Sequence, residues 1–211
     1  MYTNISSKLQ HYIETEIIPR YLNFDAAHQI DHARYVIKES LKLAEHYPVN
    51  LNMVYTIAAY HDTGLKEGRK FHHLESGKII REDTNLRDFF SESEIEIMAQ
   101  AAEDHRASNK QPPRSIYGMI VAEADRCIDG ETIIRRTIQY GLSHYPALQK
   151  HEHYQRFLVH MKEKYANGGY LKIWLHESSN AEHLKAFQTL LEDEELTKNL
   201  FERIWDEVHT D

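Results

Sequence analysis

The chain has 211 residues, 41% of them apolar and 27% charged, so it is long enough for one folded domain with a substantial core. Its net charge of -8 argues against general nucleic-acid binding, and no apolar run approaches the roughly 18 residues of a membrane span. One cysteine, Cys127, excludes an internal disulfide, and the N-terminus lacks a secretion signal, so we expect a cytoplasmic protein.

Apolar residues recur with a helical period along almost the whole chain, and no segment shows the alternation of a strand. Asn50 or Asn52 is placed to cap one helix, and Ser91 with Glu94 resembles a capping box for another. The sequence therefore predicts an all-α helical bundle. Its helices are expected at residues 6–18, 26–46, 51–61, 72–82, 91–105, 115–128, 131–142, 151–165 and 180–208, the last as one long helix or two short ones.

Ionisable residues occupy positions in these helices that should be apolar. A buried imidazole or carboxylate without a partner is costly, and a bound metal ion removes that cost. Imidazole nitrogens and carboxylate oxygens suit divalent or transition metals such as Fe, Mn, Zn, Ni, Co or Mg. We therefore expect one or two metal ions in the bundle. The candidate ligands are His32, His61, Asp62, His73, His105 and Asp125.

The order of these residues resembles the HD superfamily of metal-dependent phosphohydrolases. That family has an isolated histidine, an adjacent His-Asp doublet at a helix end and a later aspartate. The segments AHQIDH (27–32), AAYHDTG (58–64) and VAEADR (121–126) are similar to its three ligand segments. The resemblance implies an HD-type bundle in a single domain. Residues 1–24 would form an N-terminal helix, 25–130 the metal-binding core, and 131–211 a helical extension packed on the core or on a second subunit of a homo-oligomer.

The same resemblance bears on the number of metal ions. His73 followed by Gly77 is similar to the His-x-x-x-Gly element of binuclear members, and His105 falls where they carry a further histidine. By analogy, Asp62 would bridge two ions, with His32, His61 and Asp125 on one and His73 and His105 on the other. His72 is not in this set and is expected to face solvent. Two departures matter. Arg34 follows the first histidine by two residues rather than three, and the paired histidines of cyclic-dinucleotide phosphodiesterases are missing.

The implied reaction is hydrolysis of a phosphate ester or phosphoanhydride, with a small phosphorylated and nucleotide-like substrate. Metal-bound hydroxide would be the nucleophile, held by Asp62 or Asp125. An anionic substrate needs fixed cations, and Lys66 is the first candidate, followed by Arg69, Arg106 and Arg126. His28 is a candidate for contacting substrate or protonating the leaving group. Asp31 and Asp104, next to ligand histidines, are candidates for orienting them.

Two other functions stay open at this point. Some HD-superfamily members use a similar ligand set as mixed-valent di-iron oxygenases. Alternatively, the chain is a non-catalytic, metal-stabilised module that senses a ligand. The sequence names neither the substrate, nor the native metal, nor the number of subunits.

Overall fold

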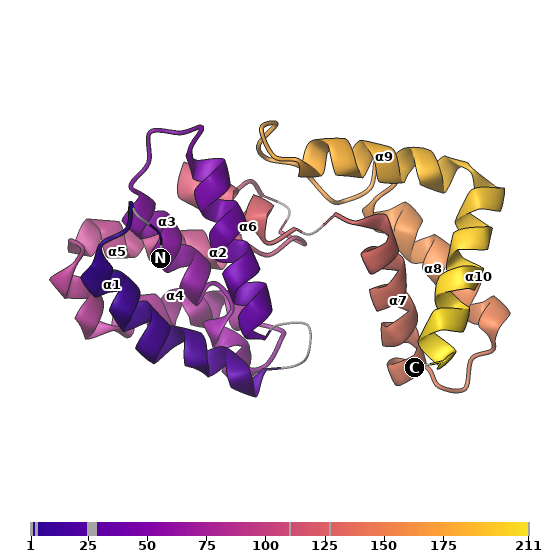
Figure 1. Cartoon of the computed structure of the whole chain (residues 1–211), viewed down its shortest axis with the longest axis horizontal. Coiled ribbons are helices and arrows are strands. Elements are labelled where there is room, and N and C mark those ends of the chain that lie inside the picture. The colour runs from indigo at the N-terminus through magenta and orange to yellow at the C-terminus, as the bar shows by residue number, and fades with distance from the viewer. Residues whose placement is uncertain (1, 3, 25–28, 110, 127, 211) are drawn as a thin grey trace. The chain divides into compact units, whose positions relative to one another are not determined.

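The computed structural model describes residues 2, 4–24, 29–109, 111–126 and 128–210. Within these ranges every regular element is helical, which confirms the all-α prediction. The chain divides into two compact units, residues 1–126 and 127–211, drawn indigo to magenta and brown to yellow in Figure 1. None of the described helices is long and apolar enough to cross a membrane.

The described residues of unit 1 form ten helical elements. Six are α-helices, and four are short π or 3-10 turns that connect or extend them. In chain order these are α1 (Ser7–Tyr12), η1 (Ile13–Ile17), η2 (Ile18–Asn23), α2 (Ile30–Ala44), α3 (Leu51–Tyr60), η3 (Thr63–Glu67), α4 (His72–Glu82), η4 (Thr84–Asp88), α5 (Glu92–Asp104) and α6 (Ile116–Ala124).

The first helical segment differs from its prediction. The α-helix ends at Tyr12, one π-helical turn follows, and a 3-10 helix continues to Asn23. The sequence predicts that this helix ends at residue 18, directly before Pro19. Instead Pro19 lies in the first turn of the 3-10 helix, where its missing N–H is not needed. The second predicted helix starts at Ile30 in α2, and the expected start at residue 26 lies outside the described residues.

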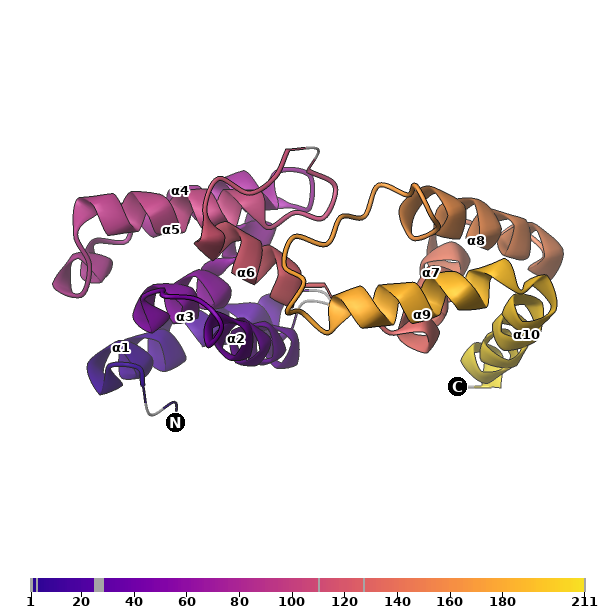
Figure 2. The ribbon, with the colours of Figure 1, turned by 90° about the horizontal axis from the view of Figure 1, so that it is seen from above.

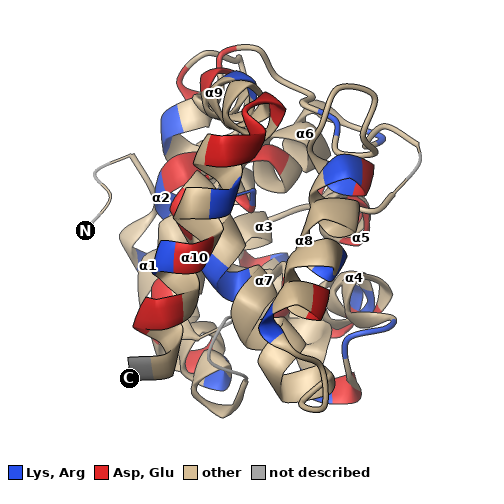
Figure 3. Cartoon of the chain, turned by 90° about the vertical axis from the view of Figure 1, so that its right-hand side faces the viewer, with Lys and Arg blue, Asp and Glu red and all other residues tan. Residues whose placement is uncertain are grey.

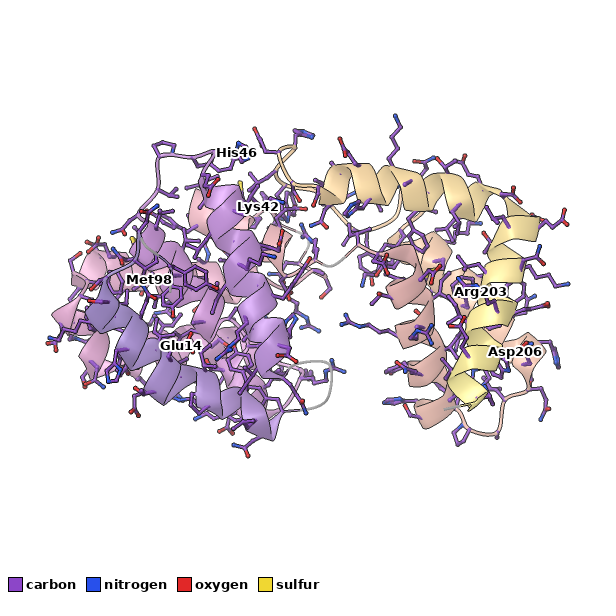
Figure 4. The ribbon with its side chains drawn as sticks, in the orientation of Figure 1. Glu14, Lys42, His46, Met98, Arg203 and Asp206 are labelled. Atoms are coloured by element: carbon purple, nitrogen blue, oxygen red, sulfur yellow. The ribbon has the colours of Figure 1, made fainter. Side chains whose placement is uncertain are left out.

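Side-chain caps set two of the helix starts as the sequence indicated. Asn50 accepts a hydrogen bond from the backbone N–H of Asn52 at the start of α3. Ser91 and Glu94 form the predicted capping box at the start of α5. Apolar faces of α2, α3 and α5 then meet in one core, in which Met98 is fully buried (Figure 4). This core fixes the helix ends that carry the candidate ligands.

Unit 2 is built from four helices, α7 (Gly130–His144), α8 (Lys150–Lys164), α9 (Asn180–Glu192) and α10 (Glu194–Thr210). The last predicted segment is two helices, because the chain becomes extended at Asp193 between α9 and α10 (Figure 2). Phe157 of α8 packs against Phe201 of α10, with ring centroids 5.2 Å apart. Both acidic and basic residues lie along α10 (Figure 3), and Arg203 pairs with Glu131 of α7. Packing of unit 2 on unit 1 stays a prediction.

One buried histidine should make unit 2 sensitive to acid. His153 of α8 is 1% exposed, its ring lies 5.2 Å from that of Trp205, and neither ring nitrogen has a hydrogen-bond partner among the described residues. Burial, and then the charge of Arg156, lower its pKa below the usual 6.5; Glu152 and His209 also face it. The unfolded chain therefore binds this proton more readily than the folded one, so stability falls as pH drops below about 6.5.

Thermal unfolding between about pH 7.5 and pH 5 tests this expectation. His153→Leu should reduce the loss of melting temperature on acidification. His151→Gln, on the same helix but exposed, should leave it as in the wild type. An unchanged pH slope in His153→Leu would show that other groups control acid unfolding.

Candidate metal centre

Helix ends in unit 1 bring six ionisable side chains to one place. His32 lies in the first turn of α2, and His72 is the first residue of α4. The C-cap residues that directly follow α3, α5 and α6 are His61, His105 and Asp125. The C-terminal end of a helix carries partial negative charge, so three such ends meeting at one point favour a cation there.

Asp62 lies at the centre of this cluster, and each of its carboxylate oxygens faces a different pair of imidazoles. Oδ2 is 3.5 Å from His32 Nε2 and 3.3 Å from His61 Nε2. Oδ1 is 3.4 Å from His72 Nε2 and 3.5 Å from His105 Nε2. Asp62 therefore joins two groups of potential ligands, one with His32 and His61 and the other with His72 and His105.

Asp125 completes the first group. Its Oδ1 lies 3.2 Å from His32 Nε2 and 3.7 Å from His61 Nε2. The site is largely closed to solvent, with His61 fully buried and the His32 and Asp125 side chains 17% and 23% exposed.

Three of the histidines are held in the same way by the main chain. Nδ1 of His61, His72 and His105 lies 2.7, 2.8 and 2.6 Å from the carbonyl oxygen three residues earlier, which belongs to Ala58, Arg69 and Ala102. A carbonyl can only accept, so Nδ1 carries the proton in each ring. The lone pair of each neutral ring is therefore on Nε2 and points into the cluster.

This arrangement fits a cation. Nε2 of His72 and Nε2 of His105 are 3.2 Å apart, and Nε2 of His32 and Nε2 of His61 are also 3.2 Å apart. Two nitrogen lone pairs at this distance repel unless a positive charge, either a proton or a metal ion, lies between them. A metal ion in each group would supply that charge, and mixed imidazole and carboxylate donors suit a transition metal.

The acid–base behaviour of the cluster supports the same conclusion. Burial alone would lower the pKa of His32, but its hydrogen bonds to Asp125 and Asp62 outweigh burial and raise the pKa to about 9. Burial alone would raise the pKa of Asp62, but the charge of His61 and the hydrogen bonds of His105 and His32 hold it well below its usual value. The pKa of Asp125 falls to about 2 in the same way, mainly because of His32. The two carboxylates thus stay ionised and attract positive charge.

His73 is not in the cluster, which corrects the ligand expected from the sequence. His72 takes that place: it begins α4, whereas the ring of His73 lies 5.5 Å from that of His72 and its Nδ1 is buried without a hydrogen-bond partner. Burial and the nearby charge of His105 lower the pKa of His73 to about 4, so the ring is neutral. The expectation that His72 faces solvent is wrong, because its side chain is 14% exposed.

Two glycines explain how α4 approaches closely enough to deliver His72. A Cβ on Gly64 would lie 2.1 Å from the carbonyl oxygen of His72, so only glycine lets η3 touch the start of α4. A Cβ on Gly77 would lie 2.8 Å from the carbonyl oxygen of Ala99 in α5. The glycine in the His-x-x-x-Gly element therefore serves helix packing.

Two residues that hold the site in place were not predicted from the sequence. The hydroxyl of the buried Tyr21 donates to the Ala59 carbonyl at 3.0 Å and accepts from the Asp62 N–H at 3.3 Å, so it holds the doublet in place. The carboxylate of Glu103 forms ion pairs with Arg81 at 2.5 Å and with Arg114 at 2.6 Å. These pairs fix the end of α5 next to His105. Neither has a local motif, since both depend on pairing between distant segments.

Asp31 and Asp104 do not orient the ligand histidines. Asp31 is exposed on α2, and Asp104 accepts hydrogen bonds from the backbone and side chain of Arg114. Because the main chain occupies Nδ1 of His105, no carboxylate is needed there.

The cationic side chains predicted to bind substrate lie in different environments. Lys66 and Arg69 are exposed on the loop after the doublet. Arg106 donates to the carbonyl of Lys70 at 3.1 Å and so ties that loop to the end of α5. Arg126 differs from its prediction as a substrate-binding residue. Its side chain is 5% exposed and pairs with the buried Glu123 at 2.9 Å, so it is not accessible to a substrate. His28 lies outside the described residues.

Comparison with known proteins agrees with the helical arrangement. Residues 30–128 match the family model of the HD domain. A crystal structure described as a predicted HD superfamily hydrolase, from an uncultured Thermotogales bacterium, is similar in fold with a TM-score of 0.51 and 21% sequence identity. The match covers 74% of this chain and 94% of that one. A comparison with curated proteins found no match.

Proposed function

Because residues 30–128 match the family model of the HD domain, we propose that this chain is a metal-dependent phosphohydrolase with two adjacent metal ions. The observation that carries the proposal is the central carboxylate of Asp62, which faces one group of nitrogen ligands with each oxygen. In this proposal His32, His61 and Asp125 hold one ion, and His72 and His105 hold the other. The native metal is Fe, Mn, Zn, Ni, Co or Mg.

The residues around the cluster have defined tasks in such a reaction. Bound metal ions would lower the pKa of coordinated water toward about 7 and polarise a phosphoryl oxygen. The main-chain carbonyls of residues 58, 69 and 102 keep the ligand rings in one tautomer. Asp62 and Asp125 stay ionised, so their oxygens can bind the metal ions and accept a hydrogen bond from an attacking water. Lys66, on the loop after the doublet, would bind the anionic substrate.

The expected substrate is a small phosphate ester or phosphoanhydride of nucleotide type. The test is release of phosphate, pyrophosphate or nucleoside monophosphate from a panel of such compounds, using protein loaded separately with each metal. Silence across the panel with two metal equivalents bound would contradict the proposal. Oxygen uptake together with an iron paramagnetic signal would favour a di-iron oxygenase instead, and tight ligand binding without turnover would favour a sensing module.

Metal removal should destabilise unit 1. An ion that binds only the folded state at 100 times its dissociation constant adds about 2.7 kcal/mol of stability. For a protein of this size that corresponds to roughly 5–10 °C in melting temperature. We therefore expect chelation to lower the melting temperature by about that amount, and re-addition of the metal to restore it. Calorimetry checks this, and an unchanged transition after chelation would argue that no resident metal is present.

A further inference from the structure

A small pocket in unit 1 combines apolar walls with positive charge. It has a volume of about 350 Å³ and is lined by Asn23, Phe24, Leu65, Lys66 and Arg69. Phe24 and Leu65 are partly buried, whereas the amide and the two cationic side chains are exposed at its edge. Ligand pockets for small molecules have this composition, with apolar walls and a few polar groups that fix orientation.

The pocket adjoins the candidate metal centre through both ring contacts and the backbone. The ring of Phe24 lies 5.3 Å from that of Tyr21, which in turn lies 6.3 Å from that of His61. The N–H of Leu65 donates to the carbonyl of Asp62 at 2.9 Å. On the other edge, the carbonyl of Arg69 accepts the Nδ1–H of His72. A ligand in the pocket would therefore lie next to the centre.

Charge favours an anionic ligand in this pocket. Its lining contains two cationic side chains and no carboxylate. A neighbouring pocket shares Lys66 but is lined by the carboxylates Glu16, Glu82 and Asp83. The second pocket also contains cations and apolar side chains, but its three carboxylates would repel an anion. An anion with an organic ring is therefore expected in the first pocket, whose lining has no carboxylate.

We propose that this pocket, named here the Phe24 pocket, selects phosphate compounds whose organic part carries a planar heteroaromatic ring. Phe24 and Leu65 contact the faces of the ring, and Lys66 and Arg69 contact the anionic part between the ring and the metal centre. The inference rests on the proposed function for the position of the phosphate, but ring recognition is a separate property. It assigns Phe24 as a specificity-determining residue.

The test compares two compounds that differ only in the ring, adenosine 5′-monophosphate and ribose 5-phosphate. Binding is measured by calorimetry on the full chain after chelation, so that no hydrolysis occurs. The wild type should bind adenosine 5′-monophosphate about 10-fold more tightly, because base stacking on an aromatic side chain has that magnitude. Phe24→Ala should abolish this preference while leaving the affinity for ribose 5-phosphate unchanged.

Leu22→Ala is the matched control, because Leu22 lies in the 3-10 helix that Phe24 directly follows, is 67% exposed and does not line the pocket. Leu22→Ala should keep the preference for adenosine 5′-monophosphate. Arg69→Gln should weaken the binding of both compounds equally. Equal affinity of the wild type for the two compounds, undetectable binding of adenosine 5′-monophosphate, or a preference that survives in Phe24→Ala would overturn the inference. If the preference follows Phe24 but the metal-loaded protein hydrolyses no compound of the phosphate panel described above, the pocket stands and the proposed function fails.

Discussion

Asp62→Asn is expected to abolish turnover and to remove most of the bound metal. The substitution keeps the shape of the side chain but removes the negative charge that both groups of histidines face. We expect metal content to fall from about two equivalents to below one, and kcat/KM for any hydrolysed phosphate compound to fall on the order of 10³-fold. Elemental analysis and steady-state kinetics on the same preparation measure both.

Asp31→Asn is the matched control for Asp62→Asn. It makes the same chemical change next to the ligand His32, but its side chain is exposed and outside the cluster. Metal content and turnover should stay as in the wild type. If Asp62→Asn retains two equivalents of metal, the central carboxylate does not bridge two ions and the proposed centre is wrong.

His72→Ala and His73→Ala should behave differently although the residues are adjacent. His72 directs Nε2 at Asp62 and His105, whereas His73 lies outside the cluster. We expect His72→Ala to lose about one metal equivalent and roughly 100-fold or more in kcat/KM, since a ligand should matter at least as much as the groups that orient it. His73→Ala should retain both ions and most of the activity.

The outcome of this pair distinguishes the spatial arrangement from the motif. Equal loss of metal in both variants would mean that the start of α4 as a whole is required, through packing. Loss only in His73→Ala would restore the ligand expected from the sequence. Melting temperatures of the metal-free variants show whether either substitution disturbs the helix itself.

Much of the fold was predictable because helical periodicity and caps are local. Asn50 and Ser91 start their helices as the sequence indicated. The 3-10 continuation through Pro19 was not predictable, because its apolar residues Ile18 and Tyr21 are held by the tertiary core and not by local propensity. Tertiary contacts also decide the division into two compact units after residue 126, which periodicity does not encode.

The candidate site was predictable in its composition more than in its details. His32, the doublet and Asp125 converge as expected, because their order and local segments carry the signal. Whether His72 or His73 joins the cluster depends on how α4 is rotated about its axis at its first turn. That rotation is set by the contact of Gly64 with the His72 backbone, which no pattern within α4 reveals. The burial of Arg126 depends likewise on its partner Glu123.

The main-chain carbonyls that hold three of the imidazoles have a consequence for how this centre could diversify. Every amino acid supplies a carbonyl, so replacing Ala58, Arg69 or Ala102 leaves the tautomers of His61, His72 and His105 unaltered. A partner carboxylate, by contrast, would make each imidazole more basic and would vanish on substitution. The tautomers of these nitrogen ligands therefore do not depend on which side chains the three positions carry. Adaptation to a different metal would have to act through the two aspartates or through the surrounding loops.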